Sequence, residues 1–83
     1  MIMESLQEQV LETLRDTFWP EIQIDFHDER GDGKHFFVEV ISEKFETKNR
    51  VERSQMVYAS LWDFLKTDSI HALRMKCIAP SEL

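Results

Sequence analysis

Hydrophobic and polar side chains recur along the chain with two different periods, which divide it into expected helices and strands. Between residues 5 and 18 the apolar side chains recur every three or four positions, as in a helix with one buried face. Ser5 and Glu8 have capping-box spacing at its start, and Trp19-Pro20 ends it because a residue before proline is pushed out of helical conformation. The apolar stripe consists of Leu6, Val10, Leu11, Leu14 and Phe18.

Residues 21–27 and 35–42 alternate at every second position, which predicts two half-buried strands. The Gly-Asp-Gly-Lys stretch between them predicts a hairpin turn. It is not a phosphate loop, because it lacks the Lys-Ser/Thr ending and precedes a strand instead of a helix. The expected apolar faces are Ile22, Ile24 and Phe26 in the first segment, and Phe36, Val38 and Val40 in the second.

The second half of the chain continues with a charged, irregular stretch over residues 43–50 and a helical pattern over residues 51–66. Val57, Leu61, Phe64 and Leu65 form the buried stripe of this helix, with Arg50 and Arg53 beginning on a short separate turn. Residues 70–78 predict a third strand. On it, His71, Leu73, Met75 and Cys77 share one face, and Ile70, Ala72, Arg74 and Lys76 share the other.

This order of elements predicts one domain over residues 1–83 of the α+β class. We expect helix, strand, strand, one or two helices, and strand, with the helices packed on a three-stranded sheet.

Charge and composition narrow the classes of function. The chain carries a net charge of -6, so strong non-specific binding to nucleic acid is not expected. Its one cysteine, Cys77, has no partner for an internal disulfide, which favours a reducing compartment. No apolar run approaches the ~20 residues of a membrane span, and MIMESLQEQ does not resemble a signal peptide. We therefore expect a soluble cytoplasmic protein.

Three histidines are the candidates for metal chemistry, because no nucleophile and base stand in a recognisable pattern. His27 ends the first expected strand, whereas His35 and His71 begin the second and third. If the strands are neighbours, two of the three meet at one end of the sheet. Imidazole is a good ligand for iron, zinc or copper, but two imidazoles make only an incomplete site. The alternative is that each histidine is an ordinary surface or core-edge residue.

Two segments of the chain carry a resemblance to a known family. The segment HFFVEVISEKFETKNRVERSQMVYASL, followed by IHALRMKCIAPSEL, resembles the BolA family in the order and spacing of its motifs. The pattern is His-Phe, Val-x-Val-x-Ser-x-x-Phe, Arg-x-x-x-Val-Tyr-x-x-Leu, His-Ala-Leu and a terminal Pro-x-Glu. Gly-Asp-Gly-Lys-His-Phe and Asn-Arg-Val-x-x-x-Gln-x-Val-Tyr look closer to the acid-stress-linked YrbA-type branch.

The chain also departs from the family pattern at two places. Arg53-Ser54-Gln55 stands where many members have Arg-His-Arg, and Ala79 to Leu83 lacks the usual terminal tryptophan. The resemblance implies the BolA fold, which is similar to the type II KH arrangement.

The resemblance also implies a function. BolA-like proteins bind monothiol glutaredoxins and share a 2Fe–2S cluster, for which the glutaredoxin cysteine and glutathione supply the sulfurs. The near-invariant histidine of the family falls on His71. A second ligand comes from the loop between the first two strands, where Asp32 stands about where some relatives have cysteine. We favour His35 for this role over His27, because His35 directly follows the loop.

The expected function is thus a non-enzymatic adaptor in iron–sulfur cluster trafficking or in iron and stress regulation, with no cluster bound by the chain alone. The alternative is a DNA-binding regulator of stress response and cell morphology that uses a KH-like helical face. Glutamates interleave with its basic residues and no Gly-x-x-Gly clamp is present. The sequence does not decide whether a homodimer forms. The DNA contacts would be Lys44, Lys48, Arg50 and Arg53.

Overall fold

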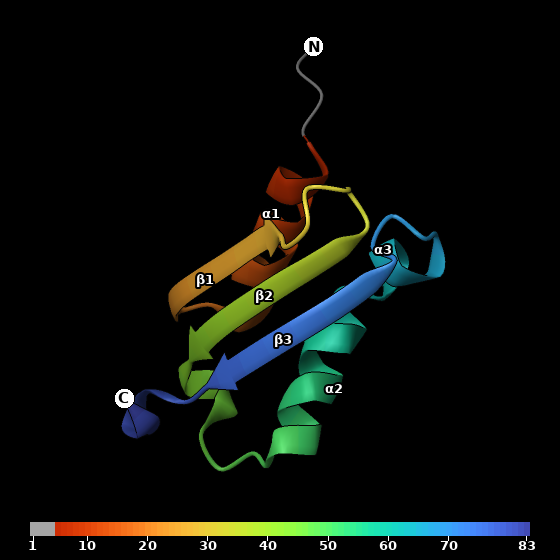
Figure 1. Cartoon of the computed structure of the whole chain (residues 1–83). Coiled ribbons are helices and arrows are strands. Elements are labelled where there is room, and N and C mark those ends of the chain that lie inside the picture. The colour runs from red at the N-terminus through yellow and green to blue at the C-terminus, as the bar shows by residue number, and fades with distance from the viewer. Residues whose placement is uncertain (1–4) are drawn as a thin grey trace.

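The computed structural model describes residues 5–83, except for the side chains of residues 21 and 22 (Figure 1). The expected position of Ile22 on an apolar face therefore lies outside the described residues. The observed order of helices and strands confirms the α+β class expected from the sequence. In chain order the elements are α1 (Leu6–Phe18), β1 (Glu21–Asp28), β2 (His35–Ser42), α2 (Arg50–Ser60), α3 (Trp62–Lys66) and β3 (Ala72–Ile78), with single helical turns at Glu43–Phe45 and Pro80–Glu82.

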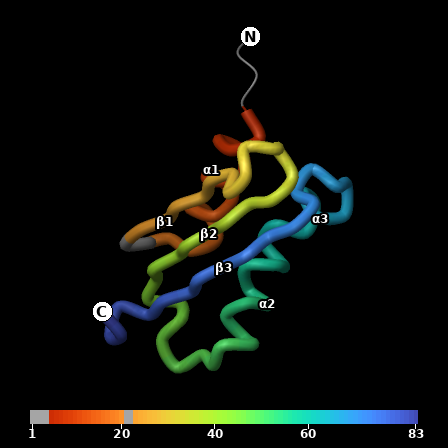
Figure 2. Tube along the Cα trace, viewed as in Figure 1, coloured from red at the N-terminus to blue at the C-terminus, as the bar shows by residue number. Residues whose placement is uncertain are grey.

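The sheet has the strand order β1-β2-β3, so β2 lies in the middle. β1 and β2 form the expected antiparallel hairpin, whereas β2 and β3 are parallel. Figure 1 shows the helices on one side of the sheet, which leaves the other side open. The parallel pairing matters for function, because it brings the start of β3 beside the start of β2. Figure 2 shows the loop before β2 next to the segment that enters β3.

The core lies between the helices and the covered side of the sheet, as the two periods of the sequence predicted. Val10, Leu14 and Phe18 form the buried stripe of α1. Ser5 caps this helix by accepting a hydrogen bond from the Glu8 N–H at 3.2 Å. The sheet, α2, the junction at Leu61 and the turn after α3 add further side chains to the same cluster, namely Phe26, Phe36, Val38, Val40, Val57, Leu61 and Ile70.

The predicted helix over residues 51–66 is in fact two helices that meet at Leu61. The backbone of Leu61 has φ -106° and ψ 10°, which interrupts the helix, although its side chain is fully buried. Neither glycine nor proline marks this break, so the helical pattern continues across it. Arg50 and Arg53 belong to α2 itself, and the expected separate turn for them was wrong.

The third strand begins at Ala72, and its predicted start at Ile70 was wrong. The Ile70 N–H donates to the Phe64 carbonyl at 3.1 Å, so this residue belongs to the turn after α3. Ile70 is buried, whereas His71 is exposed, which reverses the expected alternation. The cause is that residues before a strand do not follow its two-residue period. Within β3 the expectation holds, because Arg74 and Lys76 are exposed and Leu73, Met75 and Cys77 pack against the core.

The charged stretch after β2 contains a core residue that the sequence pattern did not indicate. Phe45 is fully buried in the helical turn that follows β2. Its ring lies 5.1 Å from the ring of Phe18, measured between centroids. The buried hydroxyl of Ser42 donates to the Phe18 carbonyl at 3.1 Å, so the end of β2 is joined to the end of α1.

Candidate functional site

The loop between β1 and β2 is organised by the carboxylate of Asp28. One oxygen accepts from the backbone N–H groups of Arg30 at 3.1 Å and Gly31 at 2.8 Å, and the other accepts from Gly33 at 2.6 Å. These bonds, that of Gly33 first, hold the pKa of Asp28 below its usual value. Gly31 and Gly33 have φ angles of 70° and 71°, which glycine adopts without the cost borne by other residues. Asp28 therefore orders the loop.

A second carboxylate, Asp32, connects this loop to the first residue of β2. Its Oδ1 accepts from the backbone N–H of Lys34 at 2.9 Å and of His35 at 3.1 Å. Its Oδ2 lies 2.8 Å from Nδ1 of the His35 ring. The Lys34 N–H and then the His35 side chain lower the pKa of Asp32 to about 2. Asp32 is consequently an ionised carboxylate that accepts a hydrogen bond from the ring of His35.

His71 lies beside His35 because β2 and β3 run parallel. His35 is in register with Ala72, and the Ala72 N–H donates to the Lys34 carbonyl at 2.9 Å. The preceding residue, His71, places its ring 6.0 Å from that of His35 between centroids, at an interplanar angle of 74°. The sequence expected two histidines to meet at one end of the sheet if the strands were neighbours, and the structure meets that condition for His35 and His71.

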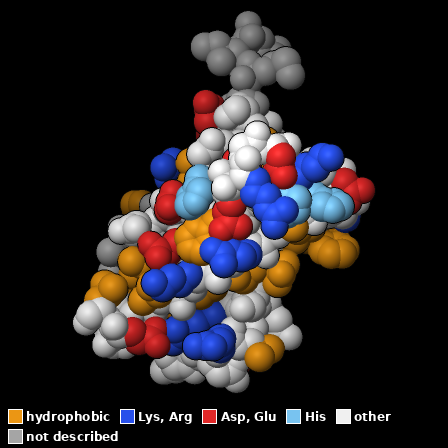
Figure 3. Space-filling view, in the orientation of Figure 1, with side chains coloured by type: hydrophobic (Ala, Val, Ile, Leu, Met, Phe, Trp, Pro, Cys, Tyr) orange, Lys and Arg blue, Asp and Glu red, His pale blue; other side chains and the backbone are white. Residues whose placement is uncertain are grey.

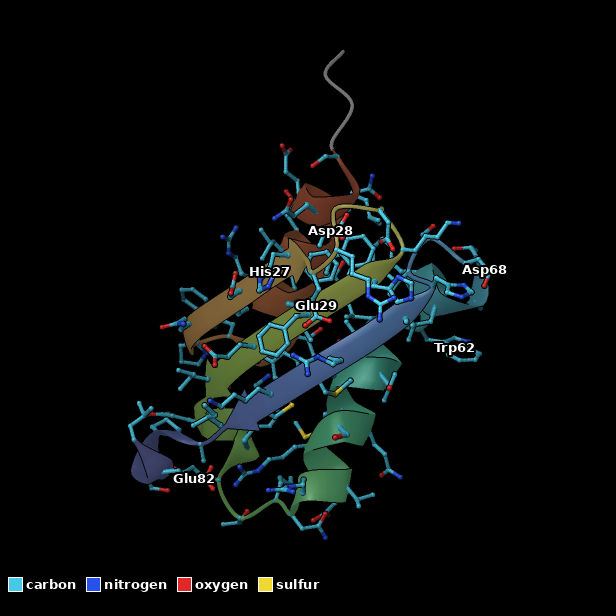
Figure 4. The ribbon with its side chains drawn as sticks, viewed as in Figure 1. His27, Asp28, Glu29, Trp62, Asp68 and Glu82 are labelled. Carbon is cyan, nitrogen blue, oxygen red and sulfur yellow. The ribbon has the colours of Figure 1, made fainter. Side chains whose placement is uncertain are left out.

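The structure does not bring His27 into this pair. His27 lies on the open face of β1, in register with Phe37, and their ring centroids are 5.4 Å apart. Its Nδ1 lies 3.3 Å from a carboxylate oxygen of Asp25. Figure 4 shows His27 on β1, and Figure 3 shows two separate areas of histidine on this face. Among the described residues, no three histidine, cysteine or acidic side chains form a group that could hold a metal.

Charged side chains border the histidine pair on the open side of the sheet. The guanidinium of Arg30 lies 3.5 Å from Nε2 of His35. Glu29, labelled in Figure 4, pairs with the guanidinium of Arg74 at 2.8 Å. A hollow of about 220 Å³ lies here, and its walls include Arg30, His35 and Leu73. The pair is thus reachable from solvent, and His35 retains 27% of its side-chain exposure.

The DNA-binding alternative names four basic residues as contacts. Two of them form hydrogen bonds or ion pairs within the chain. The Lys44 ammonium donates to the Thr17 carbonyl at 2.7 Å. Arg53 donates to the carbonyls of Lys48 at 2.9 Å and Cys77 at 3.3 Å, and pairs with Glu82 at 2.5 Å. Arg53 therefore joins α2 to β3 and to the last helical turn.

The other two basic residues, Lys48 and Arg50, line a hollow of about 510 Å³ at the opposite end of β3 from the histidines. Within residues 5–83, neither side chain has an ion-pair or hydrogen-bond partner. Of the four candidate DNA contacts, the side chains of Lys44 and Arg53 therefore have partners within the chain, whereas those of Lys48 and Arg50 have none among the described residues.

Cys77 lines the hollow beside Lys48 and Arg50 and lies away from the histidine pair. Its side chain is half-buried, and burial raises the pKa of the thiol to about 11. A neutral thiol is a poor metal ligand and a poor nucleophile. Cys77 therefore behaves as a small apolar residue.

Sequence reasoning did not identify Arg30 and Asp32 as neighbours of a candidate ligand. The available signal was the spacing Asp-x-x-His directly before a strand, which places a short carboxylate within reach of the ring and of the backbone N–H groups. What the pair can do chemically is donate two imidazole nitrogens to a metal, which is two ligands fewer than a closed structural site uses.

No helix of the described residues is long and apolar enough to cross a membrane.

Comparison with known sequences identifies relatives over part of the chain. Acid stress protein IbaG of Escherichia coli (strain K12) is 38% identical over 52 residues, which are 63% of this chain and 62% of IbaG. Protein BOLA2 of Arabidopsis thaliana is 50% identical over 46 residues, 55% of this chain and 47% of that relative. The chain thus spans less than two thirds of the length of these relatives. The IbaG match agrees with the expected acid-stress branch.

Comparison with solved structures covers nearly the whole chain. BolA1 from Arabidopsis thaliana matches with a TM-score of 0.87 at 29% identity, covering 98% of this chain and 99% of that chain. The BolA domain of SufE1 from Arabidopsis thaliana gives 0.86 at 26% identity, covering 99% and 100%. The family model described as BolA-like protein matches residues 2–82. This chain therefore belongs to the BolA-like family.

Proposed function

We propose that this chain is a non-enzymatic adaptor that binds a monothiol glutaredoxin and shares a 2Fe–2S cluster with it, in cluster trafficking or in iron and stress regulation. The observation that carries the proposal is the pair formed by His35 and His71, whose ring centroids are 6.0 Å apart at an accessible end of the sheet. The cluster is cargo that passes through the complex. Its sulfur ligands would come from the glutaredoxin cysteine and from glutathione.

The donor set of this chain fits one half of such a cluster. Two histidines and two thiolates form the ligand set of Rieske centres, in which imidazole ligation raises the reduction potential. The pair would supply the two nitrogens, and among the described residues no group of three histidine, cysteine or acidic side chains could hold a metal. We therefore propose that the partner supplies the remaining ligands of the cluster.

The two histidines are held in different ways. His35 lies at the start of the central strand and is fixed by the ordered loop that Asp28 and Asp32 organise. His71 is exposed in the turn that enters β3. We infer that His35 gives a preset direction for one metal bond, whereas His71 is free to adjust to the partner. One fixed and one adjustable ligand would suit a site that must both hold and release the metal.

The test is a mixture of this chain with a monothiol glutaredoxin, glutathione, iron and sulfide, monitored by visible absorption and circular dichroism. We expect a spectrum that differs from that of the glutaredoxin alone, and that returns to it in His71→Ala. His27→Ala is the matched control, because this imidazole lies outside the pair. An unchanged mixed spectrum in His71→Ala would show that the ligand assignment is wrong.

A further inference from the structure

The ring of His35 has a different neighbour at each of its two nitrogens. Nδ1 lies 2.8 Å from the Oδ2 atom of Asp32, and Nε2 lies 3.5 Å from the guanidinium of Arg30. Each neighbour has only one possible role in a hydrogen bond. An ionised carboxylate has no proton to give and can only accept, whereas a guanidinium has no lone pair to offer and can only donate.

Both contacts therefore require the same form of the neutral ring. Nδ1 carries the proton and donates it to Asp32, while Nε2 carries the lone pair and accepts from Arg30. The other neutral form would place a lone pair against the carboxylate and an N–H against the guanidinium. Two independent neighbours thus select one tautomer, and this tautomer has a free electron pair on the outer nitrogen.

We propose that Asp32 is a positioning residue that holds His35 with its proton on Nδ1, so that Nε2 is the nitrogen that binds metal. This inference rests on the proposed function. A carboxylate that accepts a proton from a ligating imidazole fixes both the ring orientation and the tautomer. Asp32 is itself fixed, because its second oxygen accepts from the backbone N–H groups of Lys34 and His35.

Arg30 has the opposite part in this arrangement. Its contact with Nε2 is long, and the side chain is exposed, so the hydrogen bond is weak and readily broken. A metal bound at Nε2 would displace the guanidinium and would leave the shorter bond to Asp32 intact. Arg30 thus shields the electron pair until a partner arrives.

The variant Asp32→Asn separates the tautomer from the order of the loop. The amide oxygen can keep both backbone hydrogen bonds, from Lys34 and His35, while the new NH₂ group replaces the atom that faces the ring. An NH₂ group only donates, so Nδ1 must now accept and the ring proton moves to Nε2. A flipped amide would place its NH₂ against two backbone N–H groups, and is therefore disfavoured. The change should invert the tautomer while the loop keeps its shape.

The first measurement uses the chain alone, labelled with ¹⁵N in its histidines, at a pH where the rings are neutral. Correlation of the ring nitrogens with the ring C–H protons reports which nitrogen carries hydrogen. We expect His35 to be protonated on Nδ1 in the unaltered chain and on Nε2 in Asp32→Asn. Asp28→Asn is the control, because it loosens the same loop without touching the ring. Protonation of Nε2 in the unaltered chain, or no change in Asp32→Asn, would overturn the proposal.

The second measurement separates this inference from the proposed function. In the mixed complex, Asp32→Asn should weaken cluster binding by about tenfold or more, the usual effect of removing such a hydrogen bond from a metal ligand. If His71→Ala leaves the complex unchanged, the proposed function fails, whatever the tautomer is. If His71→Ala removes the histidine signature and Asp32→Asn binds as tightly as the unaltered chain, only the assignment of Nε2 and Asp32 fails.

Discussion

The rings of His35 and His71 lie side by side, 6.0 Å apart between centroids, although they come from opposite halves of the chain. Their closeness follows from the parallel register of β2 and β3, in which His35 faces Ala72. A hairpin partner would not produce it, because the antiparallel register places His27 opposite Phe37 instead. The topology of the sheet therefore selects which two of the three histidines can act together.

Phe45 should be essential for stability, although it lies in a charged stretch. Its side chain is fully buried against Phe18, so Phe45→Ala should lower the free energy of unfolding by about 3–5 kcal/mol. Val51→Ala is the control, because this side chain is 65% exposed and its loss should change the free energy by less than about 0.5 kcal/mol. Urea unfolding measures both. Equal effects would contradict the packing described for Phe45.

The free energy of unfolding at acidic pH should depend on the carboxylates of Asp28 and Asp32. The pKa values of Asp28 and Asp32 are lowered in the folded chain, that of Asp32 to about 2. A lowered pKa gives stability that is present above the unfolded value of about 4 and is lost as the pH falls through the folded value. We expect the free energy of unfolding to fall between about pH 4 and pH 2, and less steeply in Asp32→Asn. An identical slope in the variant would contradict this role of Asp32.

The thiol of Cys77 should react slowly while the chain is folded. Burial raises its pKa to about 11, so at pH 8 the thiolate fraction should be about a hundredfold smaller than in the unfolded chain. Iodoacetamide alkylation, followed by mass spectrometry with and without denaturant, measures the two rates. Similar rates in both states would show that burial neither shields the thiol nor raises its pKa.

Binding to DNA, if present, should show a shallow dependence on salt. Only Lys48 and Arg50 have free cationic groups in the proposed contact set, so log affinity against log salt should have a slope of about -2. Lys48→Gln and Arg50→Gln should each reduce the slope by about one, whereas Lys44→Gln should not change it. A slope near -4 that also falls in Lys44→Gln would support the four-residue DNA face.

The sequence predicted most of the fold but only part of the site. The spacing of apolar side chains predicted one helix and two strands, each with one buried face, over residues 5–18, 21–27 and 35–42. The order of the strands in the sheet then places His35 near His71. The burial of Phe45 could not be predicted, because a single apolar residue in a charged stretch does not recur at the spacing of a helix or a strand. The contacts of Asp32 and Arg30 with His35 depend on the positive φ angles of Gly31 and Gly33, which the pattern of apolar residues does not encode.

The central claim, that His35 and His71 are cluster ligands, is tested most directly by labelling this chain alone with ¹⁵N-histidine. The mixed complex with unlabelled glutaredoxin is reduced, and pulsed electron paramagnetic resonance then detects nitrogens bound to the cluster. We predict two ¹⁵N couplings, both kept in His27→Ala and at least one lost in His71→Ala or in His35→Ala. A reduced cluster without ¹⁵N coupling, or with both couplings intact in His71→Ala, would contradict the account.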